Sequence, residues 1–313
     1  MRAVVFRDGS VIVQEHPDPE PGTGQVLVRV RAAGINGGDL LQRAGLYPAP
    51  PGSPRDIPGL ELAGEVVAVG ASAVRFSVGD RVMGIVGGGA QAELLPVHER
   101  QLMPVPAALP DEEAGGFPEA FTTAHDALVT QGGLSTGMRL LVHGAAGGVG
   151  TAAVQLGRLL GAHVTATVRS DGSREAVAAL GADVVLDPAD FVEQGPYDVI
   201  LELVGAPNLP GDVQALAVGG HVVVIGVGAG RQAELDLLAL MGKRGTVCAS
   251  TLRGRPLEEK ALTARRVEAQ VLPAVADGRL VVPVARTFPL EEVAAAYDHF
   301  AAGGKVGKVV LLP

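Results

Sequence analysis

The amino-acid sequence predicts an α/β protein that combines a doubly wound parallel sheet with a second, mostly antiparallel β domain. Residues 121–250 alternate apolar runs with helix-forming segments, as a parallel sheet with crossover helices requires. Residues 1–109 instead carry short runs of alternating apolar and polar residues between Gly, Pro and Asp turns, which is typical of half-buried antiparallel strands. The C-terminal tail has the texture of this first region, so we expect the two ends of the chain to fold together around an inserted domain.

The alternating region predicts six parallel strands, at residues 139–143, 163–168, 183–186, 198–204, 221–227 and 245–249. The intervening helices are expected at residues 151–160, 174–180, 209–217 and 234–240. An open sheet with helices on both faces follows from this order.

The antiparallel region predicts strands at residues 3–6, 10–15, 25–33, 65–69, 81–84 and 92–96. Residues 46–58 hold five prolines and no helical period, so they form a loop, and a long loop in a compact domain is usually functional or disordered. The tail predicts a helix over 257–277 that Pro273 can bend, a strand at 281–284, a helix at 290–302 and a strand at 308–312.

The turn after the first parallel strand predicts a dinucleotide-binding site. Its sequence is His143-Gly-Ala-Ala-Gly-Gly-Val-Gly, and Ala145, Gly147 and Gly150 take the three small-residue positions of the G-x-G-x-x-G pattern. Gly147 lets backbone N–H groups approach a pyrophosphate, and Gly150 lets the helix pack tightly on the strand. The following strand, helix and strand supply the βαβ context that the pattern needs. The expected contacts are Ala145, Ala146, Gly147, Gly148, Val149 and Gly150.

The end of the second parallel strand predicts NADPH as the coenzyme. NAD-specific folds usually carry an acidic residue there, whereas this strand ends in Arg169 and Ser170, with Arg174 close behind. A guanidinium and a hydroxyl suit a 2′-phosphate, although Asp171 is a dissenting charge and both arginines could be solvated surface cations.

The fourth and fifth parallel strands end in small turns that should line the ligand crevice. These turns are Val204-Gly205 and Ile225-Gly226, and carboxyl ends of parallel strands are where such folds bind ligands. The alternative is that the glycines only end the strands.

Composition excludes several classes of protein. The chain has 313 residues and a net charge of −9, which argues against a nucleic-acid partner. No apolar run approaches the roughly 20 residues that span a bilayer, and the first residues are strand-like rather than leader-like. One cysteine, Cys248, excludes an internal disulfide and a multi-cysteine zinc site. These features predict a cytoplasmic protein without a membrane partner.

Several stretches together resemble the medium-chain dehydrogenase/reductase superfamily, specifically its zinc-free quinone oxidoreductase (zeta-crystallin-like) branch. They are the stretch that begins Gly34-Ile-Asn-Gly-Gly-Asp, then Pro58-Gly-Leu-Glu-Leu-Ala-Gly-Glu-Val, Val78-Gly-Asp-Arg-Val, residues 137–158, and Gly304-Lys-Val-Gly-Lys-Val-Val-Leu. Ser250-Thr-Leu-Arg-Gly-Arg is similar to the stress-inducible subgroup. The resemblance implies a GroES-like catalytic domain at 1–120 and 259–313 and a Rossmann domain at 121–258. It also implies a homodimer, for which the edge strand 245–249 is the candidate surface.

The departures from zinc-dependent relatives predict that no metal is bound. Those relatives use a Cys near position 36, a His after the Pro-Gly pair and a four-cysteine lobe, whereas this chain has Asn36, Leu60 and no lobe cysteines. None of the seven His is paired at ligand spacing. The family's Tyr after the third parallel strand is replaced here by Pro188, which puts that adenine-side contact in doubt.

The resemblance places Asn36 and Tyr47 beside the nicotinamide and the substrate, and Thr123 on the nicotinamide side. Without a metal, hydrogen-bond donors must stabilise the charge that hydride transfer leaves on a carbonyl oxygen. An amide N–H pair and a phenol can do so, although Asn36 could be a turn residue and Tyr47 could merely pack the loop.

The expected activity is zinc-independent reduction of quinones by NADPH. Two alternatives stay open: reduction of an activated C=C bond in an enone or enoyl substrate, and non-catalytic binding of NADPH. The sequence shows no convincing Ser/His/Asp triad and no G-x-S-x-G elbow, so it does not indicate a hydrolase.

Overall fold

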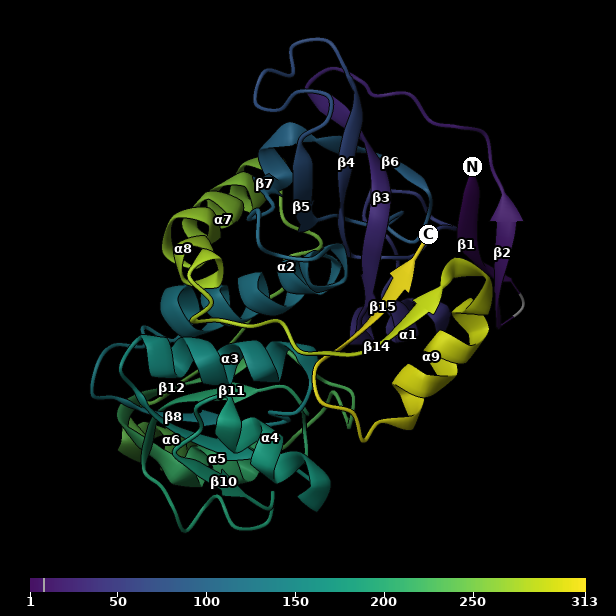
Figure 1. The fold of residues 1–313 in the computed structure, drawn as a ribbon. Coiled ribbons are helices and arrows are strands. Elements are labelled where there is room, and N and C mark those ends of the chain that lie inside the picture. Colours follow the sequence, from purple (N-terminus) through teal and green to yellow (C-terminus); the bar gives the residue numbers. More distant parts are fainter. Residues whose placement is uncertain (8) are drawn as a thin grey trace. The chain divides into compact units, whose positions relative to one another are not determined.

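The computed structural model describes residues 1–7 and 9–313, which form two compact units (Figure 1). Unit 1 comprises Met1–Thr122, Leu252–Gly303 and Lys308–Pro313, and unit 2 comprises Thr123–Thr251 and Gly304–Gly307. Each unit therefore gathers segments that are distant in the sequence. The domain boundaries predicted from the sequence are 120/121 and 258/259, and the corresponding boundaries between the units are 122/123 and 251/252.

Unit 2 is built on a six-stranded sheet in which every neighbouring pair is parallel, in the order β10-β9-β8-β11-β12-β13. The strands are β8 (Arg139–Val142), β9 (His163–Thr167), β10 (Val184–Leu186), β11 (Tyr197–Glu202), β12 (Leu216–Val224) and β13 (Thr246–Ala249). The chain runs outward from β8 to β10 and then crosses back to β11 beside β8. This order confirms the predicted doubly wound sheet and puts the reversal of strand order between β8 and β11.

The helices between these strands are α3 (Gly148–Leu159), α4 (Arg174–Ala179), α5 (Leu209–Ala215) and α6 (Leu237–Lys243). Before β8 comes α2 (Asp111–His125), which begins in unit 1 and ends in unit 2, with a π-helical continuation at Asp126–Gln131. Helices α3 and α5 lie on opposite faces of the sheet (Figure 1). Helix α6 begins three residues later than the predicted 234–240 because Asp236 caps it, accepting hydrogen bonds from the Leu238 and Ala239 amides.

Strand β13 lies at the edge of the sheet, as predicted. Helix α6, which precedes it, exposes Leu237, Leu238 and Met241. Exposed apolar side chains beside an open strand edge favour association. Pairing of two copies through this edge stays a prediction.

Unit 1 is built on a largely antiparallel sheet in the order β14-β15-β3-β4-β5-β7, and β6 also pairs with β3. The strands are β3 (Gln25–Ile35), β4 (Glu61–Val69), β5 (Arg81–Ile85), β6 (Leu94–His98), β7 (Leu102–Pro104), β14 (Val284–Pro289) and β15 (Lys308–Leu312). Because β15 pairs antiparallel with β3, the two ends of the chain share one sheet, as expected.

Two predictions for the tail were wrong in detail. The strand expected at 281–284 is instead β14, Val284–Pro289, because pairing with β15 rather than apolar content selects the strand. The helix expected over 257–277 is two helices, α7 (Leu257–Gln270) and α8 (Leu272–Ala276), because Pro273 has no N–H to donate to the preceding turn. The helix at 290–302 is confirmed as a short 3₁₀ turn followed by α9 (Val293–Ala302).

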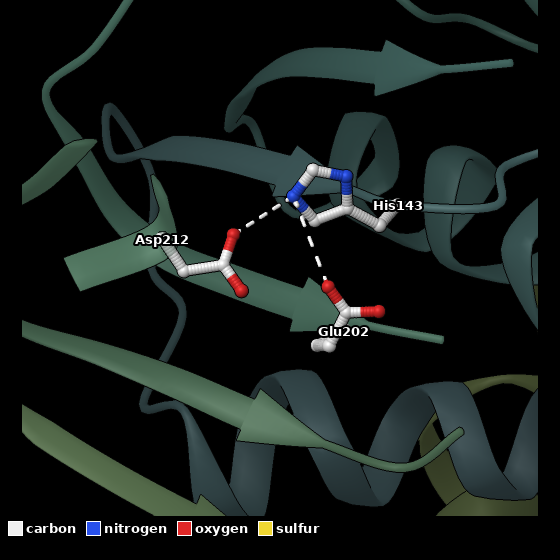
Figure 2. Close-up of side chains that lie close together, drawn as sticks. All are labelled: His143, Glu202 and Asp212. Atoms are coloured by element: carbon white, nitrogen blue, oxygen red, sulfur yellow. Dashed lines mark hydrogen bonds and ion pairs between the residues drawn. The ribbon is translucent and has the colours of Figure 1, made fainter. Parts of the chain in front are cut away.

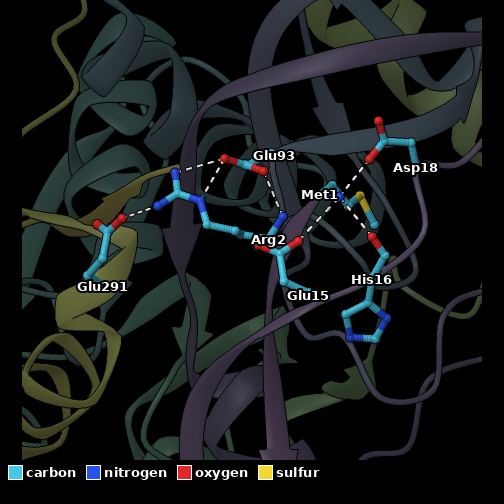
Figure 3. A network of polar contacts seen from close by, with 7 residues as sticks. All are labelled: Met1, Arg2, Glu15, His16, Asp18, Glu93 and Glu291. Carbon is cyan, nitrogen blue, oxygen red and sulfur yellow. Dashed lines mark hydrogen bonds and ion pairs between the residues drawn. The ribbon is translucent and has the colours of Figure 1, made fainter.

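Polar contacts anchor the N-terminal hairpin of β1 (Arg2–Arg7) and β2 (Ser10–Glu15) (Figure 3). The Arg2 guanidinium donates from Nε to Glu93 at 2.8 Å and also pairs with Glu291 near the end of the chain. The Met1 amino group donates to the His16 carbonyl at 2.8 Å. The hairpin is thereby tied both to the middle and to the C-terminal part of unit 1.

Each unit has its own apolar core. In unit 1, Val28, Leu62 and Val82 on neighbouring strands are fully buried together. In unit 2, Leu141 and Ile200 pack with other buried residues between the sheet and its helices. Among the described residues, none of the helices has the length and apolarity that crossing a bilayer demands.

Candidate functional site

The glycine-rich turn joins β8 to α3 in a tight bend. Gly144 has a φ of +63°, which favours glycine, and the Ala145 amide donates to the Thr167 carbonyl at 3.1 Å. A Cβ on Gly150 would lie 2.5 Å from the Gly144 oxygen, so this glycine lets the helix approach the strand. The structure thus gives Gly150 the packing role that the pattern predicts.

Gly147 differs, because the fold itself does not require a glycine there. Its φ is −73°, and a Cβ would meet only the Gly144 oxygen at 3.4 Å, an ordinary contact. Gly147 is also exposed and caps α3 without a side-chain hydrogen bond. The first-turn amides of α3, which include those of Gly148 and Val149, have no acceptor within the helix. A bare helix start with room above its cap residue fits a diphosphate.

Residues 304–307 also contact this turn. The Gly307 amide donates to the Ala146 carbonyl at 2.9 Å, and Gly307 forms a parallel bridge with Gly147. The turn is therefore hydrogen-bonded both to the end of β9 and to residues 304–307.

The residues predicted to select NADPH follow β9 directly. Arg169 and Ser170 are exposed, and the Arg169 side chain makes no hydrogen bond or ion pair within the described part of the chain. Arg174 is already engaged, since its Nε donates to Asp171 at 2.8 Å and a terminal nitrogen donates to the Val185 carbonyl at 3.1 Å. Of the two arginines, Arg169 is the one available to a phosphate.

The glycines after β11 and β12 are required by the fold. Gly205 has a φ of +118°, and a Cβ on Gly226 would lie 2.1 Å from the Leu203 oxygen. Their presence alone therefore does not indicate a ligand, and the neighbouring Val204 and Ile225 are only partly exposed. Thr123 is buried on α2.

A buried polar cluster forms around His143, the first residue of the glycine-rich turn (Figure 2). His143 Nε2 is 2.9 Å from Asp212 Oδ1 and 4.0 Å from Glu202 Oε2, and its Nδ1 is 2.9 Å from the Thr167 hydroxyl. The His143, Glu202 and Asp212 side chains have no exposed surface. One imidazole ring thus connects the ends of β8, β9 and β11 with α5.

This cluster is the one group of His and carboxylate side chains, among the described residues, whose ligand atoms lie within 4.8 Å of one another as a metal site needs. Burial raises the pKa of Glu202, and the nearby Asp212 raises it further, while His143 opposes the shift. Glu202 Oε1 accepts the Gly205 amide at 2.6 Å, so its charge is coupled to a strand-end turn. Sequence spacing missed the cluster because its members are separated by long intervals in the chain.

In unit 1, Asn36 lies between β3 and α1 (Gly37–Arg43) and is almost completely buried. Its Nδ2 donates to Glu61 Oε1 at 2.9 Å and to the Gly34 carbonyl at 3.2 Å. Its Oδ1 accepts from Lys308 Nζ at 2.6 Å. The amide can therefore reach a substrate oxygen only by giving up one of these bonds, of which the contact to Gly34 is the longer.

Lys308 was not predicted as a site residue. Its ammonium is 2.5 Å from Glu61 Oε1, and both side chains are buried. Glu61 also accepts the Glu119 amide at 2.8 Å. The sequence signal was the closing Gly-Lys motif, but nothing in the sequence relates residue 308 to Asn36. This donor set, an amide oxygen already facing an ammonium, does not fit a metal ion at the position of Asn36.

Tyr47 lies in the proline-rich loop, which contains no helix or strand, as predicted for 46–58. Its ring packs near α1, since a Cβ on Gly38 would be 3.4 Å from Tyr47 Cε1. The Arg253 guanidinium lies over the ring at 4.9 Å and donates to the Tyr47 carbonyl at 2.8 Å. Arg253 also donates to the Gly87 carbonyl at 2.7 Å, so it fixes the loop to the sheet region.

Asp39 holds α1 in place. One carboxylate oxygen accepts a hydrogen bond from the backbone N–H of Asn36 at 2.8 Å, and the other accepts one from the backbone N–H of Gly59 at 3.1 Å. Burial raises the pKa of Asp39 to about 6, although these two amides oppose the shift. The contacts of Asp39 are therefore those of a structural brace.

Comparison with known proteins matches both units to characterised families. Residues 22–107 match the alcohol dehydrogenase GroES-like domain, and residues 148–267 match the zinc-binding dehydrogenase family. The human quinone oxidoreductase is 32% identical over 94% of this chain and 91% of its own length.

Two further relatives show the spread of the group. A phenolphthiocerol/phthiocerol polyketide synthase of Mycobacterium tuberculosis is 34% identical over 96% of this chain, which spans only 14% of that protein. A crystal structure of an alcohol dehydrogenase superfamily protein from Novosphingobium aromaticivorans superposes with a TM-score of 0.88 at 32% identity, covering 100% of this chain and 99% of the other.

Breaking the buried ion pair by removing one partner should destabilise unit 1. Replacing Lys308 by Met leaves Glu61 as an uncompensated buried charge, so we expect a loss of roughly 3–5 kcal/mol in the free energy of unfolding. Urea denaturation measures it, and the Lys308→Met, Glu61→Leu double variant should recover part of the loss. A loss below about 1 kcal/mol in the single variant would contradict the assigned contact.

Asp39 should make stability fall as pH rises. Between its ordinary pKa of 3.8 and about 6, the unfolded chain releases the proton while the folded chain keeps it. The folded state then binds more protons, so this group lowers stability across that window by about 3 kcal/mol and has no further effect above it. The free energy of unfolding of the wild type, measured by denaturation at a series of pH values, should fall across this window relative to that of Asp39→Asn. The same pH dependence in both proteins would refute the raised pKa.

Proposed function

Because the chain belongs to the medium-chain dehydrogenase/reductase superfamily, and is an oxidoreductase of that family, we propose that it reduces quinones with NADPH and without zinc. The observation that carries the proposal is the arrangement around Asn36. Where zinc-dependent relatives place a metal ligand, this chain has an amide whose oxygen already accepts a hydrogen bond from the Lys308 ammonium at 2.6 Å. The likeness to human quinone oxidoreductase along nearly the whole chain supports the substrate class.

When bound, a nicotinamide coenzyme would supply the hydride. The α3 amides would hold its diphosphate, and Arg169 would hold the 2′-phosphate through charge-assisted hydrogen bonds. The Tyr47 phenol donates a hydrogen bond to the quinone oxygen on which charge develops. The Asn36 side-chain N–H donates a second hydrogen bond to the same quinone oxygen. To do so, it gives up its 3.2 Å hydrogen bond to the Gly34 carbonyl.

A second candidate is reduction of an activated C=C bond in an enoyl substrate. The likeness to a polyketide synthase, which covers 96% of the length of this chain, favours this candidate. The same donors would then stabilise an enolate oxygen, so the distinction rests on the acceptor.

Turnover of a panel of acceptors should identify the reaction. Quinones should oxidise NADPH faster than enones and enoyl thioesters, and Tyr47→Phe should lower kcat on the order of 10²-fold because one oxyanion donor is lost. Tyr197→Phe is the matched control, since the Tyr197 hydroxyl donates to the Phe191 carbonyl inside the core of unit 2. Faster turnover of enoyl thioesters would favour the second candidate, and NADPH binding without turnover would indicate a non-catalytic protein.

Coenzyme choice should depend on Arg169. We expect Arg169→Ala to weaken NADPH binding roughly tenfold or more and to leave NADH binding nearly unchanged, since only NADPH carries the 2′-phosphate. Arg158→Ala is the control, because Arg158 is an exposed cation of the same unit whose closest carboxylate, Asp183, is 3.7 Å away. An unaltered ratio of the two Kd values, measured by calorimetry, would refute this assignment.

A further inference from the structure

An open pocket of about 330 Å³ lies within unit 1 and has no role in the mechanism above. One wall comes from residues 50–53 of the proline-rich loop, and the opposite wall comes from residues 253–257 together with Lys260 on α7. Gln101 completes the lining. The pocket is thus formed by the loop that carries Tyr47 and by the segment that fixes this loop.

The pocket has a strong excess of positive charge. Arg253, Arg255 and Lys260 line it, and none of the described lining residues carries a carboxylate. Glu119 is the carboxylate that interacts electrostatically with both Arg253 and Lys260. The lining is therefore cationic in a protein whose net charge is −9. Such a concentration of cations attracts an anion.

Lys260 is a partly buried cation of this lining. Its ammonium makes no hydrogen bond or ion pair in the part of the chain that the structure describes, although it is only partly exposed. It also lines a small neighbouring cavity whose walls include Ile85, Met103 and Leu252. Burial lowers the pKa of Lys260, and the nearby Arg253 lowers it further. The negative charge of a bound anion would oppose both effects, because it favours the protonated ammonium.

Arg253 relates the pocket to the loop that carries the proposed donor Tyr47, which does not itself line the pocket. Arg253 contacts the Tyr47 ring and its carbonyl while lining the pocket. Pro50 and Ser53, which follow Tyr47 within six residues, also line it. The loop segment that follows Tyr47 therefore forms part of the pocket wall.

We propose that this pocket binds an oxyanion group of the substrate, a phosphate or sulfonate attached at a distance from the carbonyl that Tyr47 contacts. Lys260 makes the direct contact, Arg255 adds charge, and Ser53 and Gln101 offer further polar groups. That the oxyanion belongs to the substrate rests on the proposed function, whereas the binding of an oxyanion rests on the pocket alone. It assigns a substrate class, acceptors with an anionic substituent, that neither family matches nor relatives specify.

Kinetics with a matched pair of acceptors test the substrate class. The pair is a neutral naphthoquinone and the same naphthoquinone bearing a sulfonate. We expect Lys260→Gln to raise the KM of the sulfonated acceptor relative to the neutral one by about tenfold or more, since a charge-assisted hydrogen bond is lost. Arg29→Gln, which removes an exposed cation of the same unit, should leave this ratio at the wild-type value. An equal ratio in wild type and Lys260→Gln would overturn the proposal.

A binding measurement separates failure of the pocket from failure of the proposed function. Calorimetry with methyl phosphate, on protein saturated with NADPH so that the coenzyme site is filled, should detect binding to wild type and Arg29→Gln and a loss of at least tenfold in Lys260→Gln. This result would support the pocket even if no quinone were reduced. Undetectable binding to the wild type, or equal binding to all three proteins, would overturn it.

Discussion

The burial of the Lys308 ammonium against the Glu61 carboxylate is the constraint on which the substrate side of this protein depends. Two charges withdrawn from water cost more than an apolar pair of the same size, so such a pair is weak evidence for added stability. Its value here is positional. Lys308 fixes the Asn36 oxygen, Glu61 fixes the Asn36 nitrogen, and the amide can adopt only one of its two flipped orientations.

The same stretch of chain serves both units. Gly307 is bonded to the glycine-rich turn through Ala146, and the next residue, Lys308, is bonded to Asn36. A contact at the glycine-rich turn and a contact at Asn36 are therefore made by two consecutive residues.

The sequence predicted features that depend on local chemistry and missed those that depend on long-range pairing. The six parallel strands, the proline-rich loop and the Ala145–Gly150 turn follow from periodicity and small residues within short windows, and all are present. Strand β14 was misplaced because its polar residues Arg286 and Thr287 pair with β15, a partner that no local pattern reveals. Lys308 and the His143 cluster were missed for the same reason, since their partners lie far away in the chain.

The glycines show how a ligand site can be separated from the demands of the fold. At Gly150, Gly205 and Gly226 a side chain would collide with backbone or require a forbidden φ, so packing alone explains them. At Gly147 neither holds: the backbone is ordinary and the space above it is open. Selection for folding would tolerate alanine at this position, whereas a backbone that must approach a diphosphate closely would not. Gly147 is therefore the residue of the triplet that points to a ligand rather than to the fold.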